Sequence, residues 1–228
     1  MAFELTFFGH AALGLETSGV KILIDPYLRK NPAAKVDVDK IDADYILVTH
    51  GHGDHIGDTV EIAKRTGATV VSNAEISGWL KKKDVKVHPQ HLGGGHNYPF
   101  GYLKLTLALH GSALPDGSYG GNPAGLLLTT NDGEKLYFAG DTGLFGDMRL
   151  IGEEGLTLAV IPIGDNYTMG PADALRAVMM LHPEHVIPIH YDTFDLISQN
   201  AKEWAENVRV ETDTKVHLLK PGDRYVYP

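Results

Sequence analysis

Apolar and polar positions along the chain form short runs that glycine- and proline-containing turns separate. Leu103, Leu105, Leu107 and Leu109 alternate with polar or small residues, which is typical of a half-buried strand. Similar apolar runs predict strands at residues 3–8, 12–17, 20–24, 45–49, 69–71, 85–87, 126–129, 135–139, 158–163, 186–189 and 215–219. Helical periodicity and end signals predict helices at about residues 59–66, 73–83, 171–181 and 199–209. This alternation indicates an α/β fold rather than an all-β barrel.

Length and composition fit one domain that spans residues 1–228. A chain of 228 residues with 43% hydrophobic content can bury a sizeable core. No run approaches the roughly 18 apolar residues that a membrane span requires, and the first residues lack a basic segment before an apolar one. We therefore expect a soluble, cytoplasmic protein without a membrane partner. The formal net charge of −9 does not favour a nucleic-acid partner, and the absence of cysteine excludes disulfides and cysteine metal ligands.

The densest candidate chemistry follows the apolar run at residues 45–49. His50, His52, Asp54 and His55 stand close together there, and His nitrogen and Asp oxygen are ligands that suit zinc and neighbouring divalent metals. Side chains two positions apart on an extended chain point the same way, so His50 and His52 can bind one ion. A helical turn near Asp54 would carry Asp54 and His55 towards a second ion. The spacing predicts a dinuclear metal site, and the alternative is a histidine-rich surface loop that binds metal weakly or not at all.

Three further candidate ligands, His110, Asp141 and His190, also come directly after predicted strands. Asp141 lies between glycines in Gly140-Asp141-Thr142-Gly143, a position suited to bridging two metals. In open α/β sheets, functional sites form at the carboxyl ends of the strands, where a rigid backbone carries free loops. We therefore expect these side chains to converge with those of residues 50–55 on one edge of a sheet.

The His-x-His-x-Asp-His sequence after a hydrophobic strand, together with the Gly-Asp-Thr-Gly segment, resembles the signature of the metallo-β-lactamase-fold hydrolases. Residues 120–125 and 163–171 are similar to segments of a small stand-alone family of bacterial and archaeal metal-dependent hydrolases, which in turn resembles bacterial sugar-phosphate lactonases. The resemblance implies a four-layer αββα sandwich. It also implies the following ligand sets: His50, His52 and His110 on one metal, Asp54, His55 and His190 on the other, and Asp141 between them.

The same resemblance implies roles for two residues outside the ligand sets. Asp25 would orient a ligand histidine, and His10 would contact the substrate or donate a proton. On the sequence alone, both are equally well explained as turn residues. Tyr191 is a further candidate proton donor, and the sequence assigns no substrate-binding residue.

Two ions at such a site would share a hydroxide that attacks an ester, lactone or phosphoester bond of a small-molecule substrate. Asp54 would bind metal and orient the nucleophile or take its proton, so Asp54 and His10 are the catalytic candidates. Zinc is the first expectation for both ions, with manganese, nickel and iron as alternatives. A homo-oligomer is a further option, because similar lactonases assemble into oligomers.

The main alternative function is redox chemistry at non-haem iron, which the same fold supports. Flavin-linked diiron members resemble His-x-Glu-x-Asp-His at this motif, whereas position 52 here is His, and 228 residues leave no room for a flavin domain. A nuclease and a non-catalytic binding protein are less favoured, since the chain is acidic and keeps every ligand position.

A second histidine-rich segment, residues 88–96, contains His88, His91 and His96 beside three consecutive glycines. Such a backbone cannot hold metal ligands in place without outside support. The segment predicts a mobile loop near the site rather than a second metal centre.

Overall fold

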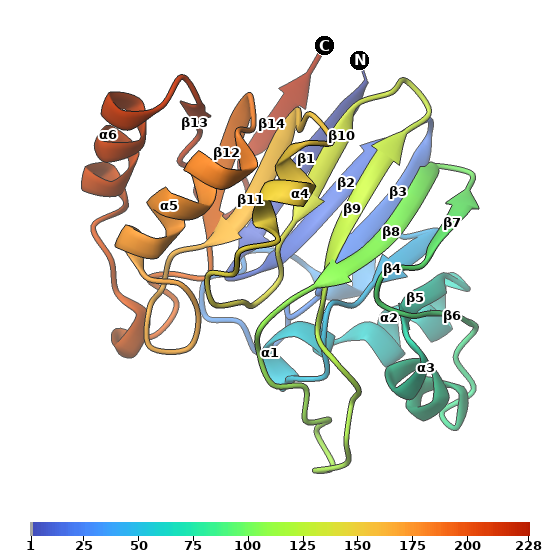
Figure 1. The fold of residues 1–228 in the computed structure, drawn as a ribbon. Coiled ribbons are helices and arrows are strands. Elements are labelled where there is room, and N and C mark those ends of the chain that lie inside the picture. The colour runs from blue at the N-terminus through green and yellow to red at the C-terminus, as the bar shows by residue number, and fades with distance from the viewer. Residues whose placement is uncertain (1) are drawn as a thin grey trace.

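The computed structural model describes residues 2–228 and contains two seven-stranded sheets packed face to face (Figure 1). Their strand orders are β14-β1-β2-β3-β4-β5-β6 and β13-β12-β11-β10-β9-β8-β7. Helices α2 and α3 contact the first sheet, and helices α5 and α6 contact the second, so each sheet has helices on its outer face. The fold is the αββα sandwich of the metallo-β-lactamase fold, as the sequence predicted.

The first sheet begins with an antiparallel meander and continues with parallel strands. Its strands are β1 (Phe3–Gly9), β2 (Ala12–Thr17), β3 (Val20–Ile24), β4 (Tyr45–Leu47), β5 (Thr69–Asn73), β6 (Val87–Gln90) and β14 (Arg224–Tyr227). Its helical elements are η1 (Val38–Lys40), α1 (Gly53–Ile56), α2 (Thr59–Thr66) and α3 (Ala74–Lys81). Strands β3, β4, β5 and β6 run parallel, so their carboxyl ends meet at one edge.

The second sheet is antiparallel from β7 to β10 and parallel from β10 to β13. Its strands are β7 (Gly95–Tyr98), β8 (Gly101–Leu107), β9 (Ala124–Thr130), β10 (Lys135–Phe138), β11 (Leu158–Pro162), β12 (His185–Ile189) and β13 (Lys215–Val216). Its helical elements are α4 (Met148–Gly152), α5 (Pro171–Leu181), η2 (Asp195–Ile197) and α6 (Ala201–Glu211).

The hydrophobic core lies between the two sheets. The β1 strand alternates between buried and half-buried residues, so Phe3 and Leu5 face inward against residues such as Leu103 and Leu128 of the other sheet. Strand β11 is buried at every position, because its outer face lies under helix α5. Two packed inner faces therefore hold the strand ends, and the loops that follow them, in fixed positions.

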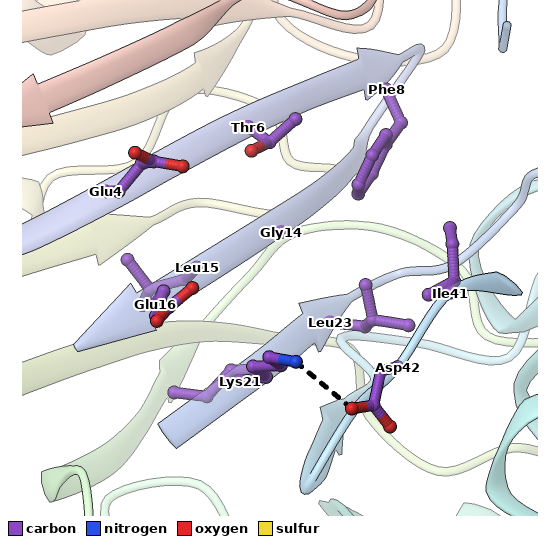
Figure 2. A pocket seen from close by; sticks show the side chains of 11 residues that line it. Glu4, Thr6, Phe8, Gly14, Leu15, Glu16, Lys21, Leu23, Ile41 and Asp42 are labelled. Atoms are coloured by element: carbon purple, nitrogen blue, oxygen red, sulfur yellow. Dashed lines mark hydrogen bonds and ion pairs between the residues drawn. The ribbon is translucent and has the colours of Figure 1, made fainter. Parts of the chain in front are cut away.

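The outer face of β1, β2 and β3 forms an open groove of about 170 Å³ (Figure 2). Glu4, Glu16 and Lys21 line it, and Lys21 Nζ lies 3.1 Å from Asp42 Oδ2. None of the predicted metal or catalytic residues lines this groove, so the candidate chemistry lies elsewhere.

Several local predictions differ from the structure. The sequence did not predict strands β7 and β14 or helix α4, and the closing strand predicted at 215–219 ends at Val216. The prediction of a loop at residues 88–96 is wrong, because most of the segment belongs to strands β6 and β7, joined by a turn. Their partners β5 and β8 lie nearby in the sequence, but residues 88–96 themselves carry no alternating apolar pattern, so these strands form through pairing in the folded sheets. Among the described residues, no helix is long and apolar enough to cross a membrane.

Candidate metal centre

All seven predicted ligand residues lie at one edge of the sandwich, where strands from both sheets end. His50 and His52 follow β4, Asp54 and His55 lie on α1, and His110, Asp141 and His190 follow β8, β10 and β12. The short helix α1 begins directly after His52, so the chain does turn into a helix at Asp54. It lies below the end of β8 in Figure 1. These side chains therefore come together, but from both sheets and not from the edge of one sheet as the sequence predicted.

The first group consists of three histidines whose ring nitrogens point at one another. His52 Nδ1 lies 3.1 Å from His50 Nε2 and 3.2 Å from His110 Nε2. The three nitrogens lie within 4.8 Å of one another, so one ion could contact all of them. His50 is fully buried, which fixes its ring, while His52 and His110 are half-buried.

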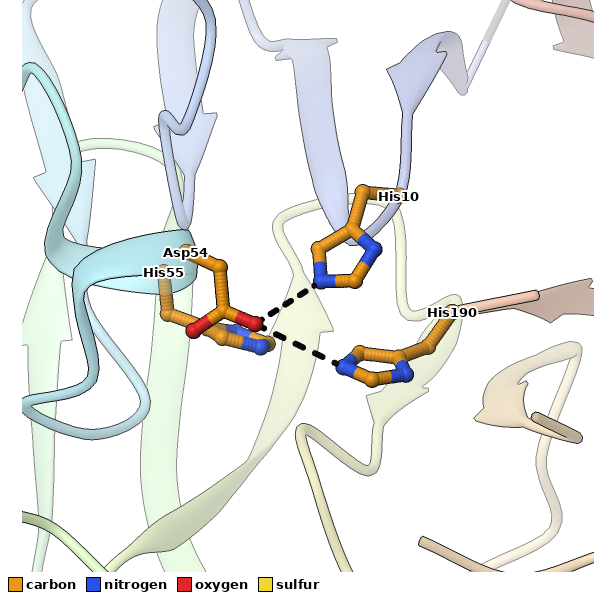
Figure 3. Close-up of side chains that lie close together, drawn as sticks. All are labelled: His10, Asp54, His55 and His190. Atoms are coloured by element: carbon orange, nitrogen blue, oxygen red, sulfur yellow. Dashed lines mark hydrogen bonds and ion pairs between the residues drawn. The ribbon is translucent and has the colours of Figure 1, made fainter. Parts of the chain in front are cut away.

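The second group consists of Asp54, His55 and His190, and His10 lies beside them (Figure 3). Asp54 Oδ2 lies 3.1 Å from His10 Nε2 and 4.0 Å from His190 Nε2. The sequence placed the first three in one ligand set, and the structure adds His10 to the same cluster of candidate donors.

Asp141 lies between the two groups. Its Oδ2 atom is 3.0 Å from His190 Nε2, 3.3 Å from His55 Nε2 and 3.5 Å from His110 Nε2. One carboxylate oxygen therefore touches histidines of both groups, as a bridging ligand must.

The hydrogen bonding of these side chains fits metal ligands better than a self-contained polar cluster. His55 Nε2, both ring nitrogens of His190 and Asp141 Oδ1 are buried without a hydrogen-bond partner. The 3.3 Å approach of His55 to Asp141 lacks hydrogen-bond geometry. A buried polar atom without a partner costs about 1–3 kcal/mol, so the fold tolerates several such costs at one place. A divalent cation would satisfy His55 Nε2, His190 Nε2 and Asp141 Oδ1, and the donor set fits zinc and its neighbours.

Asp25 holds His55 in place from behind. Its carboxylate accepts hydrogen bonds from the Thr49 backbone N–H at 2.8 Å, from the Thr49 hydroxyl at 2.6 Å and from His55 Nδ1 at 2.8 Å. Asp25, His50 and His55 also form a third group of possible ligands. Both Asp25 oxygens and His55 Nδ1 are already engaged in the hydrogen bonds just described. The contact therefore fixes the His55 tautomer, with Nε2 free to face Asp141.

His10 and Asp54 form a second histidine–aspartate hydrogen bond. His10 Nε2 lies 3.1 Å from Asp54 Oδ2, and His10 Nδ1 lies 3.0 Å from Thr193 Oγ1. The His10 side chain is fully buried, whereas 35% of the Asp54 side chain is exposed. Asp54 is therefore the member of this pair that is accessible from solvent. The substrate contact or proton donation expected of His10 stays a prediction. Sequence reasoning missed Thr193, because nothing distinguishes a loop threonine before its partner is known.

The charges of the site follow from burial and close pairing. Burial lowers the pKa of His10 to about 4, although its hydrogen bond to Asp54 acts in the opposite direction. Burial would raise the pKa of Asp141, but His55 and His190 hold it well below its ordinary value. Burial would likewise raise the pKa of Asp54, but the His10 hydrogen bond and the His55 charge hold it low. Both carboxylates are therefore ionised near neutral pH and can bind cations.

The backbone is constrained at several of these positions. His10, Asp25 and His190 have φ angles of 59°, 46° and 56°, a region that side chains rarely adopt and that often marks functional sites. Gly57 ends helix α1 at φ 35°, and a Cβ there would lie 2.5 Å from the Pro26 carbonyl oxygen. This close approach of the two loops fixes the position of α1.

The remaining histidine pairs lie outside the metal-capable groups found among residues 2–228. The ring centroids of His88 on β6 and His96 on β7 lie 4.3 Å apart, with the rings tilted by 34°. His185 Nδ1 lies 2.8 Å from His217 Nε2 at the start of β12. Tyr191 is half-buried against the apolar cluster around α5 and α6, and burial raises its pKa.

Comparison with known proteins agrees with this geometry. Residues 20–191 match the family described as the beta-lactamase superfamily domain. A protein of Heliobacterium modesticaldum called UPF0173 metal-dependent hydrolase is 47% identical over 228 residues, which cover 96% of this chain and 95% of that protein. The structure of Igni18, a metallo hydrolase from Ignicoccus hospitalis, superposes with a TM-score of 0.89 at 36% identity and covers 99% of both chains. An isothiocyanate hydrolase from Delia radicum gut bacteria shares the fold at 22% identity, with a TM-score of 0.79 over 98% of both chains.

Proposed function

The chain belongs to the beta-lactamase superfamily and is a metal-dependent hydrolase, and on this premise we propose that it uses a dinuclear centre to hydrolyse an ester, lactone or phosphoester bond of a small molecule. The observation that carries the proposal is the position of Asp141 Oδ2 within 3.5 Å of His55, His110 and His190. A carboxylate oxygen that reaches histidines of two separate groups favours two ions over one.

His50, His52 and His110 would hold one ion, and Asp54, His55 and His190 would hold the other, with Asp141 shared. Two such ions, with zinc expected first, would supply a hydroxide at neutral pH and a Lewis acid for the attacked bond.

The chain's own residues then have separable tasks. Asp25 keeps the His55 tautomer that leaves Nε2 free, and Thr49 orients Asp25 through two hydrogen bonds. Asp54 is the acidic group on the open face, so it is placed to orient a nucleophile and to accept its proton. His10 donates to Asp54 and keeps one of its carboxylate oxygens in place.

The test combines metal content with metal-restored hydrolysis. The purified apoprotein is loaded with zinc, manganese, nickel or iron and assayed on a panel of esters, lactones and phosphodiesters. We expect about two equivalents of bound metal and turnover on at least one substrate class. One equivalent of iron with oxygen uptake and no hydrolysis would instead favour the redox alternative.

A further inference from the structure

Two aromatic side chains pack against His10, beside the second ligand group. The Phe194 ring lies edge-on to His10 at 5.5 Å, and the Tyr27 ring lies edge-on to it at 5.9 Å. The exposed fraction of Phe194 is 43%, and that of Leu196 on η2 is 68%. Large apolar side chains exposed together beside a candidate active site mark a binding surface more often than isolated ones do.

A neighbouring loop extends this surface. Gln199 Nε2 donates to the Gly164 carbonyl oxygen at 2.9 Å, so the loop of residues 190–200 is tied to the loop of residues 163–170. The latter loop carries Tyr167, which is 53% exposed. We call Phe194, Leu196 and Tyr167 the apolar rim.

Most of the loops around the site lack positive charge, and the loop that carries Tyr27 is an exception. Five segments that carry site residues or the apolar rim contain no lysine or arginine: residues 48–58, 108–123, 139–147, 163–170 and 190–200. The rim loops instead carry the exposed acids Asp165, Asp192 and Asp195. Arg29, on the loop that carries Tyr27, already pairs with Asp39 and Glu61, whereas the exposed Lys30 and Lys35 of that loop form no ion pair within residues 2–228.

We propose that the substrate is an uncharged ester or lactone with an apolar group of several carbons, and that this group packs on the apolar rim. A phosphorylated substrate would bring a negative charge to loops that carry aspartates and no arginine that could bind a phosphate with two N–H groups. Its charge would therefore be unfavourable there. This inference rests on the proposed hydrolase function and narrows it to neutral carboxylic substrates.

A second copy of the chain is a less suitable occupant of the rim. A two-fold contact sets the same surface against itself, so Asp165, Asp192 and Asp195 of one copy would face the same acids of the other. Facing like charges disfavour such an interface, whereas a small neutral molecule is not affected by them.

The first experiment measures kcat/KM of the metal-loaded protein on p-nitrophenyl acetate, butanoate and hexanoate. We expect kcat/KM to rise roughly twofold for each added methylene, because a half-exposed surface removes part of each group from water. Phe194→Ala should abolish most of that rise through KM. Phe194→Leu should retain it, and Val210→Ala, at an exposed apolar position on α6, serves as the matched control.

A second arm compares a simple γ-lactone with a sugar lactone that carries a phosphate, in the wild type and in Lys30→Ala. If kcat/KM is higher for the phosphorylated lactone than for the γ-lactone, and this advantage falls in Lys30→Ala, the inference is overturned. Equal kcat/KM values for the three p-nitrophenyl esters would overturn it as well. Light scattering tests whether a second copy of the chain covers the apolar rim. The inference is also overturned if the wild type is a dimer that Phe194→Ala dissociates while the dependence of kcat/KM on acyl-chain length stays the same.

Failure of the proposed function has a different signature. If no ester or lactone is hydrolysed, the hydrolase proposal fails, and calorimetry of the metal-loaded protein with acetamide, butanamide and hexanamide still tests the rim. Affinity that increases with chain length and is lost in Phe194→Ala supports the apolar surface, and no binding of any amide overturns it.

Discussion

Asp25→Asn tests whether the residues behind the ligands control metal binding. In the wild type, the Asp25 carboxylate accepts three hydrogen bonds, from Thr49 N–H, the Thr49 hydroxyl and His55 Nδ1. An asparagine of almost the same shape has only one oxygen to accept with. If its amide nitrogen faces His55, that histidine must accept at Nδ1 and carry its proton on Nε2, which blocks the atom that faces Asp141.

The opposite amide orientation is no better, because it sets the amide N–H groups against the Thr49 backbone N–H. The substitution should therefore weaken binding of at least one ion by about 10–100-fold, or roughly 1.4–2.7 kcal/mol, as is usual for residues that orient a metal ligand. Thr49→Val, which removes only the hydroxyl, should weaken it less.

The assay is competitive titration of the apoprotein with zinc against a chromophoric chelator at pH 7. Asp132→Asn makes the same chemical change on the exposed β9–β10 turn and should leave both affinities unchanged. Circular dichroism confirms that each variant is folded. A folded Asp25→Asn protein that binds two ions with wild-type affinity would refute the reasoning.

Three further predictions concern other parts of the molecule. Asp141→Ala should empty at least one metal position when metal content is measured after dialysis against buffered zinc, and full occupancy with unchanged turnover would rule out a bridging role. Burial lowers the pKa values of His185 and His217 below the ordinary 6.5, so the unfolded chain binds more protons and stability should fall as pH drops below 6.5. The difference between the urea midpoints at pH 7.5 and 5 should therefore shrink in His185→Asn, and an unchanged difference would contradict this. Gly57→Ala should lower the free energy of unfolding by more than about 1 kcal/mol, because the added Cβ would collide with backbone atoms at a residue with positive φ. Gly53→Ala is the control, since a Cβ there meets nothing within 4 Å. Equal urea midpoints for the two variants would contradict the steric argument.

The apolar rim and the metal ligands differ in how far the sequence revealed them. The ligands follow apolar strands directly and carry chemistry that packing does not require, so their positions stand out along the chain. Phe194 and Leu196 look like ordinary loop residues until the loops after β1, β3 and β12 bring His10, Tyr27 and Phe194 together. Their meaning depends on neighbours that lie far away in the sequence.

Sequence alone determined the fold class and the seven converging ligand candidates, because strand periodicity and ligand chemistry are both local properties of the chain. Only the tertiary structure decided that one oxygen of Asp141 touches His55, His110 and His190, that Thr193 completes the hydrogen bonds of His10, and that residues 88–96 form edge strands instead of a loop. The side-chain distances depend on how two packed sheets place segments that lie far apart in the sequence, such as His10 and Thr193. Strands β6 and β7 pair with nearby segments, β5 and β8, but the glycine-rich residues 88–96 carry no alternating apolar pattern that would mark them as strands.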